Sequence, residues 1–229
     1  MAKPEENGFN GFTKKAVEFF RGIRENNNRD WFEPRKQDYI KYCVKPTWDL
    51  INEITPVMLK IDPLFQKNPQ KMISRIYRDI RFSRDKSPYK THLWFTFKRP
   101  GEQWQDAPGY YFEISADSYG YGMGMYDPSK PTMANFRREI TEKPDGFFKA
   151  VSFLKSRTNI FTAGGDSYKR PPKEKVDEKI LRWYMMKNFY FYSEKPADKT
   201  LFSAGLAEEL KRGYKTLAPL YSYLWKIKG

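Results

Sequence analysis

The sequence predicts an α+β fold: a central antiparallel sheet, arranged as a meander, with helices before and after it in sequence that pack on the sheet. Apolar residues recur at helical spacing in the first 60 residues and again in the last third of the chain. Between residues 92 and 126, short runs rich in β-forming residues alternate with turn-like segments of Pro, Gly and Asp. Strands grouped in this way, rather than alternating with helices, are typical of the α+β class.

The N-terminal region is expected to be helical. Apolar residues three and four apart predict a helix over about residues 13–24, which the asparagines 26–28 end. Asn27 or Asn28 can then cap a second helix, and Pro46 and Pro56 bound a third. The inward-facing residues expected in these helices are Phe12, Ala16, Phe19, Phe20, Ile23, Trp31, Phe32, Tyr39, Trp48, Ile51 and Ile54.

Three strands are expected over residues 92–97, 110–115 and 119–126. In the third, glycines at 120, 122 and 124 alternate with larger side chains, so one face of that strand carries no side chains. Something must therefore lie close to its backbone. A helix packed on the sheet and a flat ligand are the two candidates.

The C-terminal half is predicted to be mostly helical. Helices are expected over about 132–143, 145–156, 176–187 and 203–226, with a strand at 189–192. Gly164-Gly165 has the chemistry of a hairpin turn.

Length and composition limit the kind of protein. A chain of 229 residues is long enough to fold as a single globular domain, 1–229, without disulfide or metal. Cys43 is the only cysteine, and the polar start and lack of a long apolar run argue against a leader or a membrane span, so we expect a cytoplasmic protein. No metal-ligand cluster, phosphate-binding glycine loop or serine elbow is present, so no cofactor or metal is expected.

Positive charge is concentrated in one place. The chain carries a net charge of +14, and residues 75–92, here called the basic segment, hold six Lys/Arg, two Asp and the only histidine. Aromatic and apolar residues lie between these charges, so part of the segment must pack. They are Ile76, Tyr77, Ile80, Phe82 and Tyr89.

The basic segment is the best candidate for a binding site. Two carboxylates cannot neutralise six cations, and an unpaired cation must face water or bind an anion. We therefore expect an anionic ligand, a phosphate-bearing metabolite or a nucleic acid, with Tyr77 or Tyr89 available for stacking. The binding residues predicted are Arg75, Arg78, Arg81, Lys86, Tyr89 and Lys90. An extended segment puts Arg75, Asp79 and Arg81 on one face, whereas a helix would stack Ile76 on Ile80.

Two alternatives remain open. In an enzyme acting on a small anionic substrate, His92 is the general acid/base and Asp79 or Asp85 orients it, in a cleft beside the glycine-faced strand. In a structural or protein-interaction role, Asp79 and Asp85 instead close ion pairs that fix the loop. Residues 169–173 can add a second basic wall or form a solvated loop.

Four sequence blocks resemble a family of conserved hypothetical bacterial and fungal proteins, domain of unknown function 2461. They are Asn26-Asn-Asn-Arg-Asp-Trp-Phe32, the basic segment, Pro108-Gly-Tyr-Tyr111 with the glycine-alternating strand, and Tyr168-Lys-Arg-Pro-Pro-Lys173. The resemblance spans most of the chain and implies no particular activity. One departure stands out, because Glu174-Lys-Val-Asp177 stands where the family pattern has a glycine with an aromatic and a histidine-bearing turn.

Overall fold

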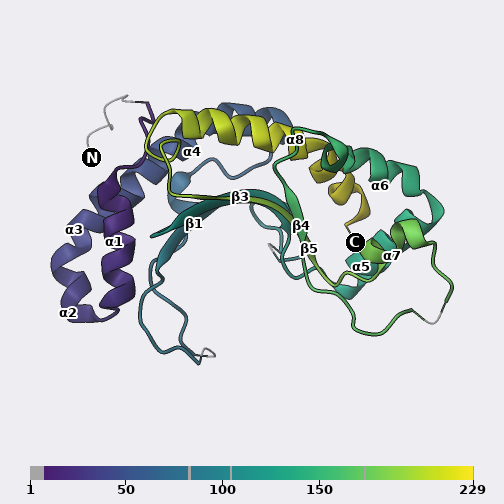
Figure 1. Ribbon diagram of the computed structural model, residues 1–229, viewed down its shortest axis with the longest axis horizontal. Coiled ribbons are helices and arrows are strands. Elements are labelled where there is room, and N and C mark those ends of the chain that lie inside the picture. The colour runs from purple at the N-terminus through teal and green to yellow at the C-terminus, as the bar shows by residue number, and fades with distance from the viewer. Residues whose placement is uncertain (1–7, 82–83, 104, 173, 229) are drawn as a thin grey trace. The chain divides into compact units, whose positions relative to one another are not determined.

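The computed structural model describes residues 8–81, 84–103, 105–172 and 174–228 (Figure 1). Phe82 of the basic segment and Lys173 of the later basic run lie outside the described residues. The chain groups into two compact units. Unit 1 comprises Met1–Thr96, Phe112–Gly120 and Glu194–Lys211, and unit 2 comprises Phe97–Tyr111, Tyr121–Ser193 and Arg212–Gly229. The single domain expected from the chain length stays a prediction.

The described residues form helices and strands in the order that the sequence predicts. The helices are α1 (Lys14–Glu25), α2 (Arg29–Phe32), α3 (Lys36–Tyr39), α4 (Lys45–Ile61), α5 (Lys130–Glu142), α6 (Pro144–Ala150), α7 (Glu178–Tyr184) and α8 (Gly205–Ile227). Shorter turns are η1 (Glu33–Arg35), η2 (Ile40–Val44), η3 (Pro69–Lys71) and η4 (Ser152–Lys155). The strands are β1 (His92–Phe97), β2 (Gly109–Ser115), β3 (Ser118–Met125), β4 (Thr162–Gly164) and β5 (Phe189–Pro196). No helix in these ranges is both long and apolar enough to cross a bilayer.

Five strands of the described chain form one antiparallel sheet in the order β1-β2-β3-β5-β4. β1, β2 and β3 are neighbours in sequence and in the sheet, so the predicted meander and the α+β class are confirmed. β5 then returns beside β3, and β4 pairs antiparallel with it, Thr162 opposite Tyr192. Along β1 and β2 buried residues alternate with half-buried ones, as expected of strands with one face on a core.

In unit 1, the N-terminal region is helical, as predicted, but its third predicted helix runs further than expected. The side chain of Asn28 caps α2 by accepting the Trp31 N–H at 3.0 Å, and helical turns then continue to Ile61. The expected interruption at Pro56 is wrong, because α4 passes through it. Ile54 and Met58, on either side of the proline, are completely buried, and this packing offsets the lost main-chain bond.

Aromatic rings dominate the core of unit 1. Phe112 of β2 stacks on Phe12 with ring centroids 6.1 Å apart, and on Phe95 of β1 at 5.3 Å. All three are at most 2% exposed. Burial of one such ring contributes about 2 kcal/mol, so this cluster fixes the segment just before α1 to the strands within the unit.

The core of unit 2 is built around Tyr214. Its ring meets Tyr110 at 5.1 Å and Tyr121 at 5.8 Å, and its hydroxyl donates to the carbonyl of Tyr111 at 2.9 Å. Complete burial raises the pKa of Tyr214 well above its ordinary value, because the phenolate would lose its hydration. The hydroxyl therefore acts as a permanent donor.

At Gly122 and Gly124, the glycine face of β3 lies against a neighbouring strand rather than against the helix or flat ligand considered from sequence. A Cβ on Gly122 would lie 2.0 Å from the carbonyl oxygen of Phe191, and one on Gly124 would lie 2.5 Å from the Cβ of Tyr190. The close neighbour is thus strand β5 of the same unit, which approaches so closely that only glycine fits.

Gly164-Gly165 does not form the tight hairpin expected from sequence. β4 pairs with β5, yet residues 165–188, including α7, lie between the two strands. Gly165 has φ +139°, and a Cβ there would lie 2.2 Å from the carbonyl oxygen of Asn188. Glycine is required here for a close approach of two segments rather than for a two-residue turn.

Candidate anion-binding hairpin

Residues 72–78 and 88–96 pair as an irregular antiparallel hairpin that leads into β1 (Figure 1, blue to teal, below β1). The extended alternative for the basic segment is therefore the one observed, and the described residues from 75 to 81 form no helix. The main-chain hydrogen bonds are Ser74 N–H to Trp94 O (2.8 Å), Lys90 N–H to Ile76 O (2.8 Å), Arg78 N–H to Pro88 O (2.9 Å) and Thr96 N–H to Met72 O (3.2 Å).

The base of the hairpin is held by the Asn26–Phe32 block. Asn27 Nδ2 donates to the carbonyl of Tyr89 at 2.9 Å, and Asn27 Oδ1 accepts the Tyr89 N–H at 3.0 Å. The Tyr89 ring stacks on Phe32 at 4.3 Å. Two sequence blocks about 60 residues apart are thus joined at one point, which positions everything the hairpin carries.

Arg78 pairs with Asp85 across the hairpin. Arg78 Nη1 lies 2.5 Å from Asp85 Oδ2, and Nη2 reaches the Tyr89 carbonyl at 3.4 Å. The Nε of Arg78 is buried and has no hydrogen-bond partner among the described residues. Bonds from Ser87, together with the nearby Arg78 charge, lower the pKa of Asp85. The Arg78–Asp85 ion pair thus links the two sides of the hairpin.

Arg81 pairs with Asp79 two residues away. Its Nε and Nη2 donate to the two carboxylate oxygens at 2.9 and 2.7 Å, a bidentate geometry. These bonds lower the pKa of Asp79 to about 2. Asp79 therefore stays negative throughout the physiological range and neutralises Arg81 locally.

Lys86 and Lys90 donate to main-chain carbonyls rather than to carboxylates. Lys86 Nζ lies 2.8 Å from the carbonyl oxygen of Ile80, and Lys90 Nζ lies 2.9 Å from that of Arg75. Burial lowers the pKa of Lys90, and the charges of Arg75 and Arg78 lower it further. These bonds position the two ammonium groups but leave their charge unneutralised.

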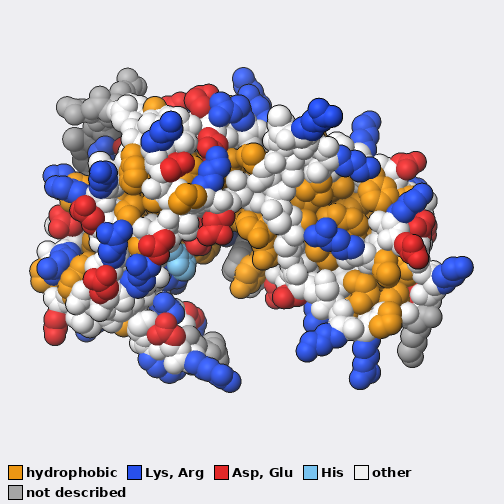
Figure 2. All heavy atoms as spheres, in the orientation of Figure 1, with side chains coloured by type: hydrophobic (Ala, Val, Ile, Leu, Met, Phe, Trp, Pro, Cys, Tyr) orange, Lys and Arg blue, Asp and Glu red, His pale blue; other side chains and the backbone are white. Residues whose placement is uncertain are grey.

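The hairpin thus keeps a surplus of positive charge. Within the described part of the chain, Arg75, Arg84, Lys86 and Lys90 form no ion pair with any carboxylate. Arg75, Arg84 and Lys86 are exposed, and Lys90 is half-buried. Figure 2 shows Lys and Arg side chains on this projecting segment at the lower left, with acidic side chains among them. The structural alternative accounts for Arg78 and Arg81 but not for these four cations.

The two tyrosines of the segment differ in access. Tyr77 is 49% exposed, whereas Tyr89 is completely buried. The Tyr77 ring packs against the Tyr89 ring, with the two ring centres 5.5 Å apart. Of the two, Tyr77 alone is open to stacking by a ligand, and Tyr89 supports the hairpin from beneath.

His92 lies at the start of β1, and its carboxylate neighbour is Glu113. Its Nε2 is 4.0 Å from a carboxylate oxygen of Glu113 on β2, and both side chains are partly exposed. Asp79 and Asp85, the orienting partners expected from sequence, are bonded to Arg81 and Arg78 instead. The expected cleft beside the glycine-faced strand is filled by β5 at Gly122 and Gly124. Acid/base chemistry by His92 and Asp79 stays a prediction.

Sequence reasoning missed Asn27, Arg84 and Glu113. The alternation of residue types in the two predicted strands could have placed Glu113 and His92 on the same, less buried face of the sheet. The others required knowledge of the hairpin pairing.

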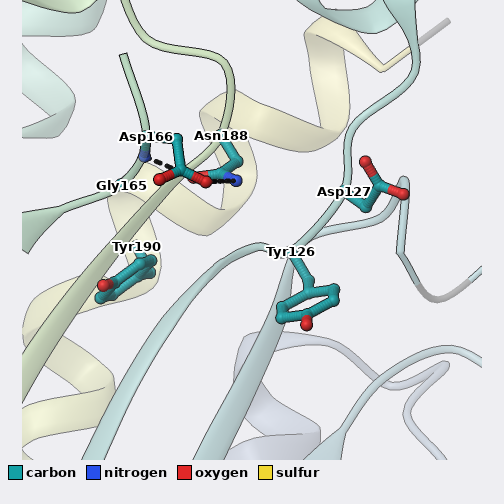
Figure 3. Close-up of a pocket in the computed structure, with 6 residues that line it drawn as sticks. All are labelled: Tyr126, Asp127, Gly165, Asp166, Asn188 and Tyr190. Carbon is teal, nitrogen blue, oxygen red and sulfur yellow. Dashed lines mark hydrogen bonds between the residues drawn. The ribbon is translucent and has the colours of Figure 1, made fainter. Parts of the chain in front are cut away.

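A cavity of about 420 Å³ in unit 2 was also missed (Figure 3). The described residues that line it include Asp127 and Asp166 and no cation. Asn188 holds Asp166 in place, because it donates to the Asp166 carboxylate at 3.2 Å and accepts the Asp166 N–H at 2.8 Å. The sign of this charge makes the cavity unsuited to an anion. Among the residues described, no group of three or more His, Cys, Asp or Glu is placed to hold a metal ion.

The chain matches the family model described as conserved hypothetical protein DUF2461 over residues 15–223. No curated protein matches it at a significant level. The match covers all the helices and strands that build the hairpin and its support, from the Asn26–Phe32 block through the basic segment to most of α8. The chain therefore belongs to the DUF2461 family of conserved hypothetical proteins.

Proposed function

We propose that the protein binds single-stranded nucleic acid through the hairpin of residues 72–96. The observation that carries the proposal is the surplus of four cations, Arg75, Arg84, Lys86 and Lys90, which the two local aspartates leave unneutralised. Proteins that bind nucleic acid take most of their affinity from such contacts with phosphates.

A polymer fits this surface better than a small metabolite does. The cations are distributed along a projecting hairpin, and three of the four are exposed. A small ligand takes its affinity from being enclosed on several sides, whereas a phosphate backbone can contact cations that follow one another along an open surface. The cytoplasmic location that the sequence predicts would place such a surface within reach of cellular nucleic acid.

Tyr77 favours a single strand over a duplex. Its half-exposed ring packs on Phe32, 6.3 Å away, and on Tyr89, 5.5 Å away. An unstacked base can lie on such a ring, and one stacked base contributes about 1–3 kcal/mol. A paired base within a duplex cannot reach it.

The number of free cations fixes the expected salt dependence. Four phosphate contacts on a single strand give a slope of about −2.8 in a plot of log K against log salt, so affinity falls roughly fiftyfold between 50 and 200 mM. Removing two of the cations should reduce the slope to about −1.4.

The test is fluorescence anisotropy with labelled single-stranded DNA and RNA across that salt range. Arg75→Gln/Arg84→Gln should halve the slope. Lys155→Gln/Arg157→Gln, which removes two exposed cations of unit 2 and gives the same net charge, should leave it unchanged. Absence of binding at 50 mM salt, or equal losses in the two variants, would reject the proposal.

Tyr77→Ala separates stacking from charge. It should weaken single-strand binding by about tenfold and leave the salt slope unchanged, because no cation is removed. A Tyr77→Phe variant, which keeps the ring, should bind as the wild type does. Equal affinity of the Tyr77→Ala variant and the wild type would show that the ring takes no part.

A further inference from the structure

A groove in unit 2 gathers positive charge independently of the hairpin. Its volume is about 540 Å³, within the range of small-ligand pockets. Among the described residues, four cations line it, Arg137, Lys169, Arg170 and Lys187, together with one carboxylate, Glu174. The sequence places these residues in three separate segments, which the fold brings to one surface.

Arg137 is fixed rigidly at the groove. It lies on α5, and its Nε and Nη2 donate to the carbonyls of Tyr184 and Met186, each at 2.9 Å. Its guanidinium also lies 5.4 Å from the ring centre of Tyr168. Main-chain carbonyls orient the guanidinium but do not neutralise it, so it presents a full positive charge in a set direction.

The loop that carries Lys169 and Arg170 is anchored at its base. Residues 166–168 pair with 185–187: the Tyr168 N–H donates to the Met185 carbonyl at 2.9 Å, and the Lys187 N–H donates to the Asp166 carbonyl at 2.7 Å. Lys187 Nζ lies 5.2 Å from the ring centre of Tyr168. The cations are therefore presented by paired segments, which limits the ordering entropy that a ligand must overcome.

The single carboxylate of the groove is engaged by a phenol. Glu174 accepts the hydroxyl of Tyr184 at 2.5 Å, and this bond lowers the pKa of Glu174 and raises that of Tyr184. Within the described residues, none of the four cations forms an ion pair with Glu174 or with another acid. The described lining of the groove thus carries four positive charges against one negative charge, in contrast to the acidic cavity of Figure 3.

We propose that this groove binds the phosphate group or diphosphate group of a small molecule. A dianionic group can accept hydrogen bonds from several cations at once, and an arginine fork held in a fixed direction suits phosphate geometry. The groove differs from the hairpin in kind, because residues from three segments line one open hollow of small-molecule size. Its residues all lie in unit 2, whereas the hairpin cations all lie in unit 1, so the two sets can be altered separately.

The test is isothermal titration calorimetry with inorganic pyrophosphate as the probe. Lys169→Gln/Arg170→Gln should weaken binding at least about tenfold, since charge-assisted hydrogen bonds are lost. These side chains are exposed and form no ion pair within the described residues, so the variant should fold. Glu174→Gln should bind pyrophosphate more tightly, because it removes the one repulsive charge.

Two controls define the outcome. Lys155→Gln/Arg157→Gln removes two exposed cations of the same unit outside the groove and should bind pyrophosphate as the wild type does. Arg75→Gln/Arg84→Gln should also keep pyrophosphate binding, so the groove is tested apart from the hairpin. Lack of pyrophosphate binding by the wild type, or an unchanged affinity in Lys169→Gln/Arg170→Gln, overturns the proposal. A loss of oligonucleotide binding alone in that variant also overturns it and assigns the groove to a polymer.

Discussion

The three consecutive asparagines 26–28 should differ sharply in their contribution to stability, although their chemistry is identical. Asn27 bonds both main-chain groups of the buried Tyr89, and Asn28 caps α2. Within the described part of the chain, the side chain of Asn26 bonds only the Gly22 carbonyl. Replacing each by alanine in turn therefore tests whether the Asn27 contact holds the hairpin.

The expected loss in the free energy of unfolding depends on which main-chain groups each substitution leaves without a hydrogen bond. In Asn27→Ala the Tyr89 N–H loses its acceptor, while the carbonyl keeps the long contact from Arg78, so we expect a loss of about 2 kcal/mol. Asn28→Ala removes an N-cap and should cost about 1 kcal/mol. Asn26→Ala should cost about 0.5 kcal/mol or less, because the Gly22 carbonyl also accepts the Asn26 N–H at 2.9 Å.

The assay is urea unfolding followed by tryptophan fluorescence, with the free energy of unfolding obtained by linear extrapolation. Hydrogen exchange at the Tyr89 amide should quicken in Asn27→Ala and stay slow in Asn26→Ala, because only the first variant frees that N–H. A loss in Asn26→Ala equal to that in Asn27→Ala, or an unchanged exchange rate at Tyr89, would refute the assignment.

Three further predictions concern other parts of the molecule. Gly122→Ala should destabilise the protein by at least about 3 kcal/mol in the same urea assay, because its Cβ would lie 2.0 Å from a β5 carbonyl oxygen. Gly146→Ala is the control and should stabilise the protein by about 0.5 kcal/mol, because its Cβ would meet only a ring carbon at 3.6 Å. Equal effects of the two substitutions on the free energy of unfolding would contradict the close approach at Gly122. Cys43 is fully buried, and burial raises its pKa, so iodoacetamide should label it only after unfolding; rapid labelling of the native protein, detected by mass spectrometry, would show that the thiol is accessible. Because the folded pKa of Asp79 is lowered to about 2, its ion pair should be complete above about pH 4 and lost as the pH falls through 2. An NMR titration should give that midpoint for the Asp79 carboxyl carbon and a higher one in Arg81→Gln, which keeps the main-chain bond from residue 81 and the nearby Arg75 charge. The same midpoint in both proteins would mean that the Arg81 side chain is not the cause.

The residue pattern along the chain predicted helices and strands well where nearby residues alone determine them. The first three strands lie within a residue of their predicted bounds, because each is a short β-rich run flanked by turn residues. Pro56 was misjudged because burial of Ile54 and Met58 outweighs the local cost of proline, and burial is a property of the tertiary structure. The glycines of β3 correctly indicated a close neighbour, but their pattern could not identify it as β5.

The site was predictable in composition and not in geometry. The excess of cations over acids in the basic segment follows from counting, yet which two arginines are neutralised depends on how the hairpin folds. Tyr77 and Tyr89 cannot be distinguished from sequence, because Tyr89 is buried by Phe32, more than 50 residues earlier. The groove around Arg137 needed three distant segments to meet, so only its loop of basic residues and prolines was visible beforehand.

Lysine acetylation measured by mass spectrometry, with and without saturating single-stranded oligonucleotide at 50 mM salt, tests the central claim most directly. If the free cations of the hairpin meet the phosphates, acetylation of Lys86 and Lys90 slows on binding while that of Lys155 keeps its rate. Unchanged rates at Lys86 and Lys90 under saturation would contradict the account, and protection of Lys169 and Lys187 in their place would move the nucleic-acid surface to the groove.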